Sequence, residues 1–292
     1  MGLKDKFKIL TYNIGIIEKD ASTVIEKGVG AGDIKWLKHS YKDRFFADPF
    51  LVKEDNEKLF IVCEELSFWN NKGIISLLVA NKSDFSLMEK KKLIEEPWHL
   101  SFPYVINNEY LLPESHKGGK AYLYHLNTST WEIDDKKLVC EECGFVDPVI
   151  IRDDNNRDVL LSTDNYSEKL YSFVLGDDGK CHQISHTPLL SDKARTRAAG
   201  SVFTYKGKTV RPVQDCVERY GRQTRIVKVN KINRDKYQAE DIAVLNSDLN
   251  PPYDETFHTF NVYENCIIVD GSKDFVRFPM KALYRLGSLI NR

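Results

Sequence analysis

Short apolar runs separated by polar turns recur along the whole chain. The segment FFADPFLVKEDNEKLFIVCEE, residues 45–65, joins two such runs through an acidic, Asn-containing turn, and GFVDPVIIRDDNNRDVLLST, residues 144–163, repeats this order with a second Asp-Pro. Runs of this length that are rich in β-branched and aromatic residues and bounded by Asp, Asn or Gly are typical of strands in hairpins. The pattern predicts antiparallel strand pairs.

Three more segments have two apolar runs around a turn: HLSFPYVINNEYLLPES (99–115), TRAAGSVFTYKGKTVRPVQDC (196–216) and FHTFNVYENCIIVDG (257–271). The expected turns are Asn107-Asn108, Lys206-Gly207 and Glu264-Asn265. The five repeats start near residues 48, 102, 147, 200 and 259, and a third apolar run follows in most of them. Their spacing of 45 to 59 residues is about the length of a four-stranded blade.

The sequence therefore predicts an all-β protein, a single five-bladed β-propeller over residues 1–292 with four-stranded antiparallel blades. Helical periodicity is confined to two short stretches, STVIEKGV and DKKLVCEE, which is too little for an α/β fold. Residues 1–40 are interpreted as an N-terminal extension. Within it, FKILTYNIGII is expected to close the ring as the outer strand of the last blade, whose own C-terminal part is FVRFPMKALYRL (275–286).

Composition narrows the possible function. The chain is 42% hydrophobic and 29% charged, as in globular proteins with a sizeable core. Its net charge of -1 argues against a general nucleic-acid-binding surface. No apolar run has the roughly 20 residues of a spanning helix, and the N-terminus does not resemble a secretory signal. We expect a cytoplasmic protein with no integral membrane segment and no nucleic-acid partner.

The six cysteines show no spacing typical of secreted domains, and we expect them to be reduced. Cys140 and Cys143 form the only CxxC, and a zinc site would need two further ligands at a recognisable spacing. We interpret them as two thiols beside a turn, with metal or redox chemistry as the alternative. The sequence predicts no metal and no cofactor.

The repeated Asp-Pro has a structural consequence in a propeller. The first strand of each blade lines the central channel, so Asp48 and Asp147 are expected to face each other across one mouth. The alternative is that each Asp only bonds backbone amides at the end of a loop.

Other polar residues are expected at the same mouth. Glu114 ends the second run of the second blade, where the first blade has Glu64 and Glu65 and the fifth has Asp270. The alternatives are a solvated turn carboxylate for Glu114 and a position in the core or in a turn for His258. The candidates from these blades are Glu114, His99, Ser101, His258, Asn261 and Asp270.

The fourth blade differs because it is rich in arginine, whose planar guanidinium matches carboxylate and phosphate oxygens in pairs. Arg211 lies inside a strand-like run, and its alternative role is an ion pair with Asp215. The candidates for substrate binding in this blade are Arg197, Arg211, Gln214, Asp215 and Tyr220. Carboxylates around a concave site with aromatic and arginine side chains suit glycosyl transfer.

The motifs FADPFL, HLSFPYVI with YLLPES, the second Asp-Pro, RAAG, RPVQDC with YG, and HTFN together resemble the N-terminal propeller domain of plant glucosamine inositolphosphorylceramide transferases and its bacterial relatives. The chain is more distantly similar to five-bladed glycoside hydrolases and phosphorylases. That resemblance implies Asp48 as a base-like or nucleophile-assisting carboxylate, Asp147 as a pKa-tuning or orienting carboxylate, and Glu114 as a proton donor. The chain departs from the hydrolases in having no Glu motif between the third and fourth blades.

The resulting functional hypothesis is a carbohydrate-active enzyme, a glycosyltransferase that uses a phosphate-containing sugar donor and a glycan or glycolipid acceptor in the biosynthesis of a surface polysaccharide or glycolipid. Two alternatives remain open. One is a glycoside hydrolase or phosphorylase that uses the same carboxylates, and the other is a non-catalytic glycan-binding propeller.

Overall fold

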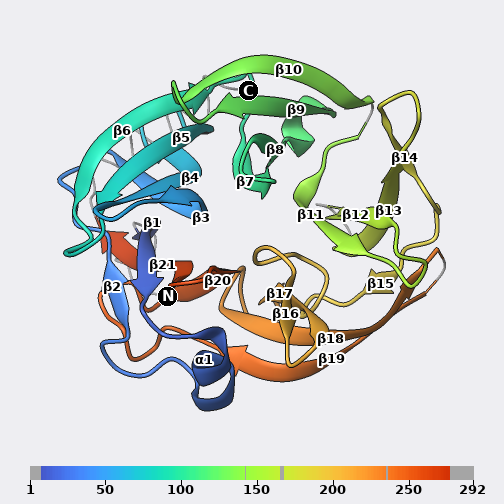
Figure 1. Ribbon diagram of the computed structural model, residues 1–292. Helices are drawn as coiled ribbons and strands as arrows, with labels where there is room; N and C mark the ends of the chain where they lie inside the picture. The colour runs from blue at the N-terminus through green and yellow to red at the C-terminus, as the bar shows by residue number, and fades with distance from the viewer. Residues whose placement is uncertain (1–7, 142, 165–167, 235, 277–292) are drawn as a thin grey trace.

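The computed structural model describes residues 8–141, 143–164, 168–234 and 236–276, and it confirms the five-bladed β-propeller. Five antiparallel sheets stand around a central axis, each with its first strand innermost (Figure 1). Four sheets have four strands, and the third blade has an additional short strand that pairs with its third strand, beside the fourth. Among the described residues, no helix has the length and apolar character needed to cross a membrane.

The strands of the first three blades follow each other in chain order. The first blade consists of β3 (Arg44–Glu54), β4 (Lys58–Ser67), β5 (Lys72–Asn81) and β6 (Leu87–Ile94). The second consists of β7 (Ser101–Ile106), β8 (Tyr110–Glu114), β9 (Lys120–Asn127) and β10 (Glu132–Glu141), with the 3₁₀ turn η2 (His116–Gly118) after β8. The third consists of β11 (Val146–Arg152), β12 (Asp158–Thr163), β13 (Lys169–Leu175), β14 (Cys181–Gln183) and β15 (Leu190–Ser191).

The last two blades bring the chain back to its start. The fourth contains β16 (Phe203–Tyr205), β17 (Lys208–Asp215), β18 (Gln223–Asn233) and β19 (Lys236–Leu245). The fifth contains β20 (Thr256–Val262), β21 (Ile267–Val276), β1 (Lys8–Ile17) and β2 (Ile34–Trp36), so its outer half comes from the N-terminal part of the chain. Helix α1 (Ala21–Lys27) connects β1 to β2 and begins at Asp20, whose carboxylate accepts a hydrogen bond from Thr23 N.

The N-terminal part of the chain closes the ring with more strand pairing than the sequence predicted. β1 pairs with β21 over ten positions, from Lys8 opposite Val276 to Ile17 opposite Ile267, and β2 then pairs with β1. The N-terminal segment therefore supplies the third and fourth strands of the fifth blade rather than one outer strand. Of the C-terminal stretch expected in that blade, residues 275–286, all but the first two lie outside the described residues.

The turns between the first two strands follow the sequence signals. Asn107 and Asn108 have φ values of 52° and 61°, and Lys206 and Gly207 have 48° and 71°, as two-residue hairpin turns require. In the first blade, Oδ1 of Asp55 accepts hydrogen bonds from the amides of Glu57 and Lys58.

A β-bulge at the start of the innermost strands accounts for the repeated Asp-Pro. The ladder shifts register between Ala47 and Phe50, between Val146 and Val149, and also in the second and fifth blades. Asp48 and Asp147 lie in these bulges with φ values of 51° and 45°. Asp tolerates such a left-handed backbone conformation. The Pro that follows has no backbone N–H, so the break in the ladder leaves no donor unpaired at that residue. Bulges redirect side chains, here toward the channel.

Interlocking apolar clusters between the blades hold these inner strands in place. Phe50 of β3 packs edge-on against Phe102 of β7, with ring centroids 5.1 Å apart, and both rings are fully buried. The same cluster continues through Val149 and Leu161 of the third blade. The bulges are thus fixed to a close-packed core, which limits the movement of any side chain that they carry.

One expectation about cysteine is wrong. Cys140 and Cys143 form a disulfide, so this pair is not reduced in the structure. Cys63, Cys181, Cys216 and Cys266 are free thiols.

Candidate functional site

A cavity of about 340 Å³ lies at the mouth of the channel where the bulges gather. Asp48 lies in its wall, together with residues from the neighbouring blades. The full lining is Tyr12, Phe45, Ala47, Asp48, Glu64, His99, Ser101, Glu114, Arg197, Tyr220 and His258. Seven of the residues predicted from the sequence, those at positions 48, 99, 101, 114, 197, 220 and 258, are thus brought together.

Asp48 is held from three sides. Its Oδ2 accepts a hydrogen bond from the amide of Phe102 in the next bulge, at 3.1 Å, and its own amide donates to Oδ2 of Asp270 at 2.9 Å. The hydroxyl of Thr259 lies 3.4 Å from its Oδ1. Burial raises the pKa of Asp48 well above its usual value, against the lowering effect of His258. Asp48 thus binds a backbone amide and also presents a basic carboxylate to the cavity.

His258 is a buried imidazolium paired with Asp270. Its Nδ1 lies 2.6 Å from Oδ1 of Asp270, and its Nε2 lies 3.9 Å from Oδ1 of Asp48. Burial lowers the pKa of His258, but the carboxylates of Asp270 and Asp48 outweigh it and raise the pKa to about 9. Asp270 is fully buried and reaches the cavity only through His258 and Asp48.

The opposite side of the cavity contains a second charged group, built around Arg197. Its Nε donates to Oδ2 of Asp147 at 2.8 Å, and its terminal nitrogen lies 3.7 Å from Oε2 of Glu114. Gln214 also donates to Asp147, at 3.1 Å. Asp147 is 3% exposed and lies behind Arg197 rather than in the cavity wall.

The two carboxylates beside Arg197 differ in protonation. Burial raises the pKa of Asp147 to about 7, against the lowering effect of the Arg197 guanidinium, and the Glu114 carboxylate adds to the rise. Burial also raises the pKa of Glu114, but the hydrogen bond with His116, at 2.9 Å, and the Arg197 guanidinium lower it to about 2. Glu114 is therefore ionised in neutral solution, which disfavours the proton-donor role that the resemblance implies.

The second blade supplies His99 in a defined tautomer. Gly73 N donates to Nδ1 of His99 at 2.9 Å, and Nε2 lies 3.2 Å from Oε1 of Glu64. With Nδ1 accepting, the neutral ring carries its proton on Nε2 and donates to Glu64. This pair fixes Glu64 at the cavity edge.

Aromatic rings form the remaining walls. Tyr12 stacks on His258 with centroids 4.8 Å apart and an interplanar angle of 15°, and Tyr220 meets the same imidazole edge-on at 5.5 Å. The Arg197 guanidinium lies over the Tyr220 ring, 4.9 Å from its centroid. Flat faces beside fixed carboxylates suit a sugar ring, which offers C–H faces and hydroxyl edges.

Besides Asp147, Gln214 and Asp270, three more predicted residues lie outside the cavity lining: Arg211, Asp215 and Asn261. Arg211 is 1% exposed and donates to the main-chain carbonyls of Arg195 and Thr196. The alternative partner, Asp215, instead accepts hydrogen bonds from Gln223 and Arg225. Asn261 is fully buried. Its amide nitrogen donates to the carbonyl of Pro49 and its oxygen accepts from Ser201 N, so it supports the first bulge from behind.

The other arginines of the fourth blade are neutralised locally. Arg195 pairs with Asp192 and Asp241, Arg219 pairs with Glu255, and Arg222 pairs with Asp248. Arg197 is the one arginine in the cavity lining.

Tyr12, Phe45, Glu64 and Thr259 were not selected from the sequence, although they shape the site. Glu64 had a signal, because it ends the second run of its blade as Glu114 does. Tyr12 had none, because its place depends on how the N-terminal strand joins the fifth blade.

Asp48, His258 and Asp270 also place one potential metal ligand each within 4.8 Å of one another. Nδ1 of His258 is bonded to Asp270, so an ion at this group would have to bind the deprotonated Nε2. Without an ion, the imidazole and Asp270 form a hydrogen-bonded ion pair.

Comparison with known proteins agrees with this architecture. The chain is 25% identical over 209 residues to glucosamine inositolphosphorylceramide transferase 1 of Oryza sativa subsp. indica, and 26% identical over 214 residues to the Arabidopsis thaliana protein of that name. These matches cover 68% of the chain but only 28% and 27% of the plant proteins, so the chain spans less than a third of their length.

A solved β-xylosidase structure shares the fold, with a TM-score of 0.52, 9% identity, and coverage of 80% of this chain and 85% of that one. Residues 34–250 match the family described as glucosamine inositolphosphorylceramide transferase 1, N-terminal. Because this match covers well over half of the sequence, the chain belongs to that family.

Proposed function

We propose that the protein is a carbohydrate-active enzyme that transfers a glycosyl group from a phosphate-containing donor at the cavity around Asp48. The observation that carries the proposal is the placement of a carboxyl group, Asp48, and a guanidinium, Arg197, in the lining of one cavity with aromatic walls. The name of the plant relatives as transferases supports the class of reaction.

The two charged groups fit the two halves of such a reaction. An acceptor hydroxyl must lose a proton as its oxygen bonds to the anomeric carbon, and Asp48, a carboxyl group in the cavity wall beside the His258 imidazolium, accepts that proton. The bond from the anomeric carbon to the phosphate oxygen breaks, and the phosphate leaves with the electron pair. Arg197 stabilises the charge that develops on it. A phosphate leaves without being protonated, so the ionised state of Glu114 is no obstacle.

Hydrolysis or phosphorolysis of a glycoside is the alternative for the same cavity. It requires a proton donor near the leaving oxygen. Asp147, whose pKa of about 7 keeps it partly protonated, is separated from the cavity by Arg197, whereas the His258 imidazolium lies in the cavity lining. A non-catalytic glycan-binding role also remains, because the plant relatives are more than three times longer than the matched part. Cytoplasmic location and a part in surface polysaccharide or glycolipid biosynthesis remain proposals.

The test is to incubate the purified protein with sugar nucleotides and simple glycan or glycolipid acceptors, and separately with oligosaccharides with and without inorganic phosphate. Release of nucleotide that depends on acceptor supports transfer. Cleavage of oligosaccharides supports the hydrolase or phosphorylase. Saturable glycan binding with no turnover in any arm supports the binding module and contradicts the proposal.

A further inference from the structure

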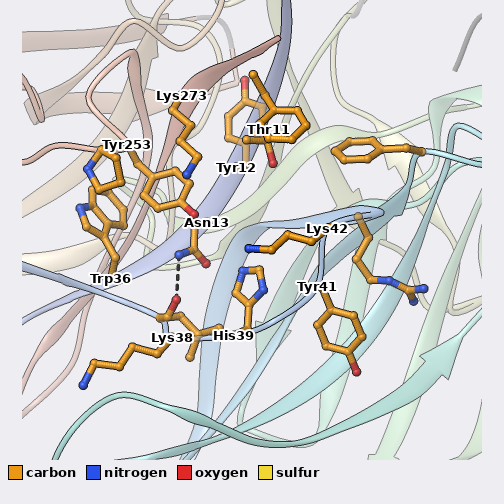
Figure 2. Close-up of a pocket in the computed structure, with 15 residues that line it drawn as sticks. Thr11, Tyr12, Asn13, Trp36, Lys38, His39, Tyr41, Lys42, Tyr253 and Lys273 are labelled. Carbon is orange, nitrogen blue, oxygen red and sulfur yellow. Dashed lines mark hydrogen bonds between the residues drawn. The ribbon is translucent and has the colours of Figure 1, made fainter. Parts of the chain in front are cut away.

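A second cavity, of about 330 Å³, lies beside the first between the fifth and first blades. Its walls come from β1, β2, β21 and the segment between β2 and β3 (Figure 2). Tyr12 lines both cavities, so the two are separated by a single side chain at that point. Nothing in the proposed reaction uses this second cavity.

The cavity is lined by cations and contains no carboxylate in its lining. Lys38, Lys42, Arg44 and Lys273 contribute side chains, and neither Asp nor Glu is among the described residues that line it. Arg44 is neutralised by Asp43 and Glu65, and Lys38 lies 3.6 Å from Asp84.

Lys42 and Lys273 have no such partner. Among the residues that the structure describes, no carboxylate lies within ion-pair distance of either ammonium group. Figure 2 shows Lys42 extending across the cavity toward Asn13, Lys273 descending beside Tyr253, and Lys38 directed away from both. The cavity therefore holds two uncompensated positive charges, which attract an anion.

His39, which also lines the second cavity, contributes a polar ring nitrogen. Its Nδ1 is buried and has no hydrogen-bond partner among the described residues. Burial lowers the pKa of His39, and the charges of Lys42 and Lys273 lower it further. A neutral imidazole with an unpaired nitrogen can donate a hydrogen bond to an anionic oxygen between the two lysines.

The wall opposite is aromatic. Trp36 and Tyr253 pack against each other with centroids 5.1 Å apart at 56°, and the ammonium of Lys273 lies 4.4 Å from the centre of the Tyr253 ring. Inorganic anions do not need such a wall, whereas the ring of a nucleoside or sugar gains apolar contact there.

We infer that this cavity is a binding site for an organic phosphate, with the phosphoryl oxygens between Lys42 and Lys273 and the organic ring against Trp36 and Tyr253. The site binds and does no chemistry, and the inference does not depend on which reaction occurs at Asp48. Phosphate is favoured over a carboxylate because its several oxygens can bond two ammonium groups and an imidazole at once.

The experiment uses inorganic pyrophosphate and uridine 5′-diphosphate as probes in isothermal titration calorimetry near physiological salt. Wild-type protein is expected to bind both saturably, and uridine 5′-diphosphate more tightly because its ring meets the aromatic wall. Lys42→Met and Lys273→Met should each raise Kd for pyrophosphate about tenfold or more, the effect of losing one charge-assisted hydrogen bond. Lys53→Met, the same change on an exposed lysine at the far end of β3, should leave Kd unchanged.

Circular dichroism and thermal melting establish that each variant is folded, and Lys42→Arg, which keeps the charge, should retain binding. The inference is overturned if the wild type shows no saturable binding of pyrophosphate, or if Lys53→Met weakens binding as much as the two cavity variants do. If pyrophosphate and uridine 5′-diphosphate bind with equal affinity, the proposal that an organic ring packs against Trp36 and Tyr253 is overturned.

Discussion

Oδ1 of Asp270 lies 2.6 Å from Nδ1 of His258, and both side chains are almost completely buried beneath the cavity. The same Asp270 carboxylate accepts the amide of Asp48 through its other oxygen, at 2.9 Å. One buried acid thus fixes both the imidazolium and the backbone of the proposed base. Asp270 thus contributes both to the charge of His258 and to the position of Asp48.

The first prediction concerns the titration of His258. Its pKa in the folded protein, about 9, lies above the unfolded value of 6.5, so its contribution to stability is fully present below pH 6.5 and is lost as pH rises through 9. The contribution amounts to about 3 kcal/mol. Nuclear magnetic resonance of the imidazole Cε1 should show a transition near pH 9. The stability difference between wild type and His258→Gln should shrink over the same interval, and a transition below pH 7 would contradict the buried ion pair.

The second prediction separates the two carboxylates beside Arg197. At pH 6, Glu114 is ionised and Asp147 is mostly protonated, as their pKa values of about 2 and about 7 require. Glu114→Gln should therefore lower the free energy of unfolding by about 3 kcal/mol, because it removes the ionised partner of a buried guanidinium. Asp147→Asn removes little charge at this pH and should cost less. Denaturant unfolding at pH 6 measures both, and the opposite order would show that the proton resides on Glu114.

The third prediction assigns Arg211 to the fold. Its guanidinium satisfies two carbonyls in a fully buried position, so Arg211→Lys should lower the free energy of unfolding by about 2 kcal/mol or more. Arg222→Lys, at a partly exposed pair with Asp248, should cost less than about 1 kcal/mol. Ligand affinity per folded molecule should be unchanged in both. A selective loss of affinity in Arg211→Lys would instead support the anion-binding role suggested by the sequence.

The fourth prediction uses two glycines with similar backbones. Gly221 has φ 59°, and a Cβ there would lie 2.5 Å from Cβ of His258, whereas Gly207 has φ 71° with nothing within 4 Å of the added atom. Gly207→Ala should cost only the backbone strain, about 1 kcal/mol. Gly221→Ala should cost more and should also shift the His258 titration, because it displaces the imidazole. An unchanged titration of His258 in Gly221→Ala would show that the added methyl group is accommodated without displacing the imidazole, and would contradict this prediction.

The sequence predicted the fold well because each blade contains its own signal. Paired apolar runs and turns such as Asn107-Asn108 are local, and their period gives the number of blades. Ring closure was less predictable, since the pairing of β1 with β21 joins the two ends of the chain. The segment from residue 21 to residue 36 gave no strand signal strong enough to reveal β2.

The site was predictable where a residue's place follows from the repeat. Asp48 reaches the cavity because the bulge recurs in four of the five blades, and Glu114 because it ends the second strand of its blade. Arg211 did not, because alternation along β17 determines whether its side chain faces the channel or the blade interior, and the run TVRPVQD does not reveal which. The lysines of the second cavity were missed, since Lys42 and Lys273 are 231 residues apart and meet only through ring closure.

The claim that Asp48 is the base of a glycosyl transfer is tested most directly by the turnover of Asp48→Asn, measured beside its melting temperature on the same preparation. Asn keeps the acceptor for the amide of Phe102, so the fold should survive, while proton acceptance is lost. Asp153→Asn is the matched control, an equally buried acid in a turn at the other end of the third blade. Turnover of sugar nucleotide is expected to fall by orders of magnitude in Asp48→Asn and not in Asp153→Asn. Full turnover in folded Asp48→Asn would contradict it.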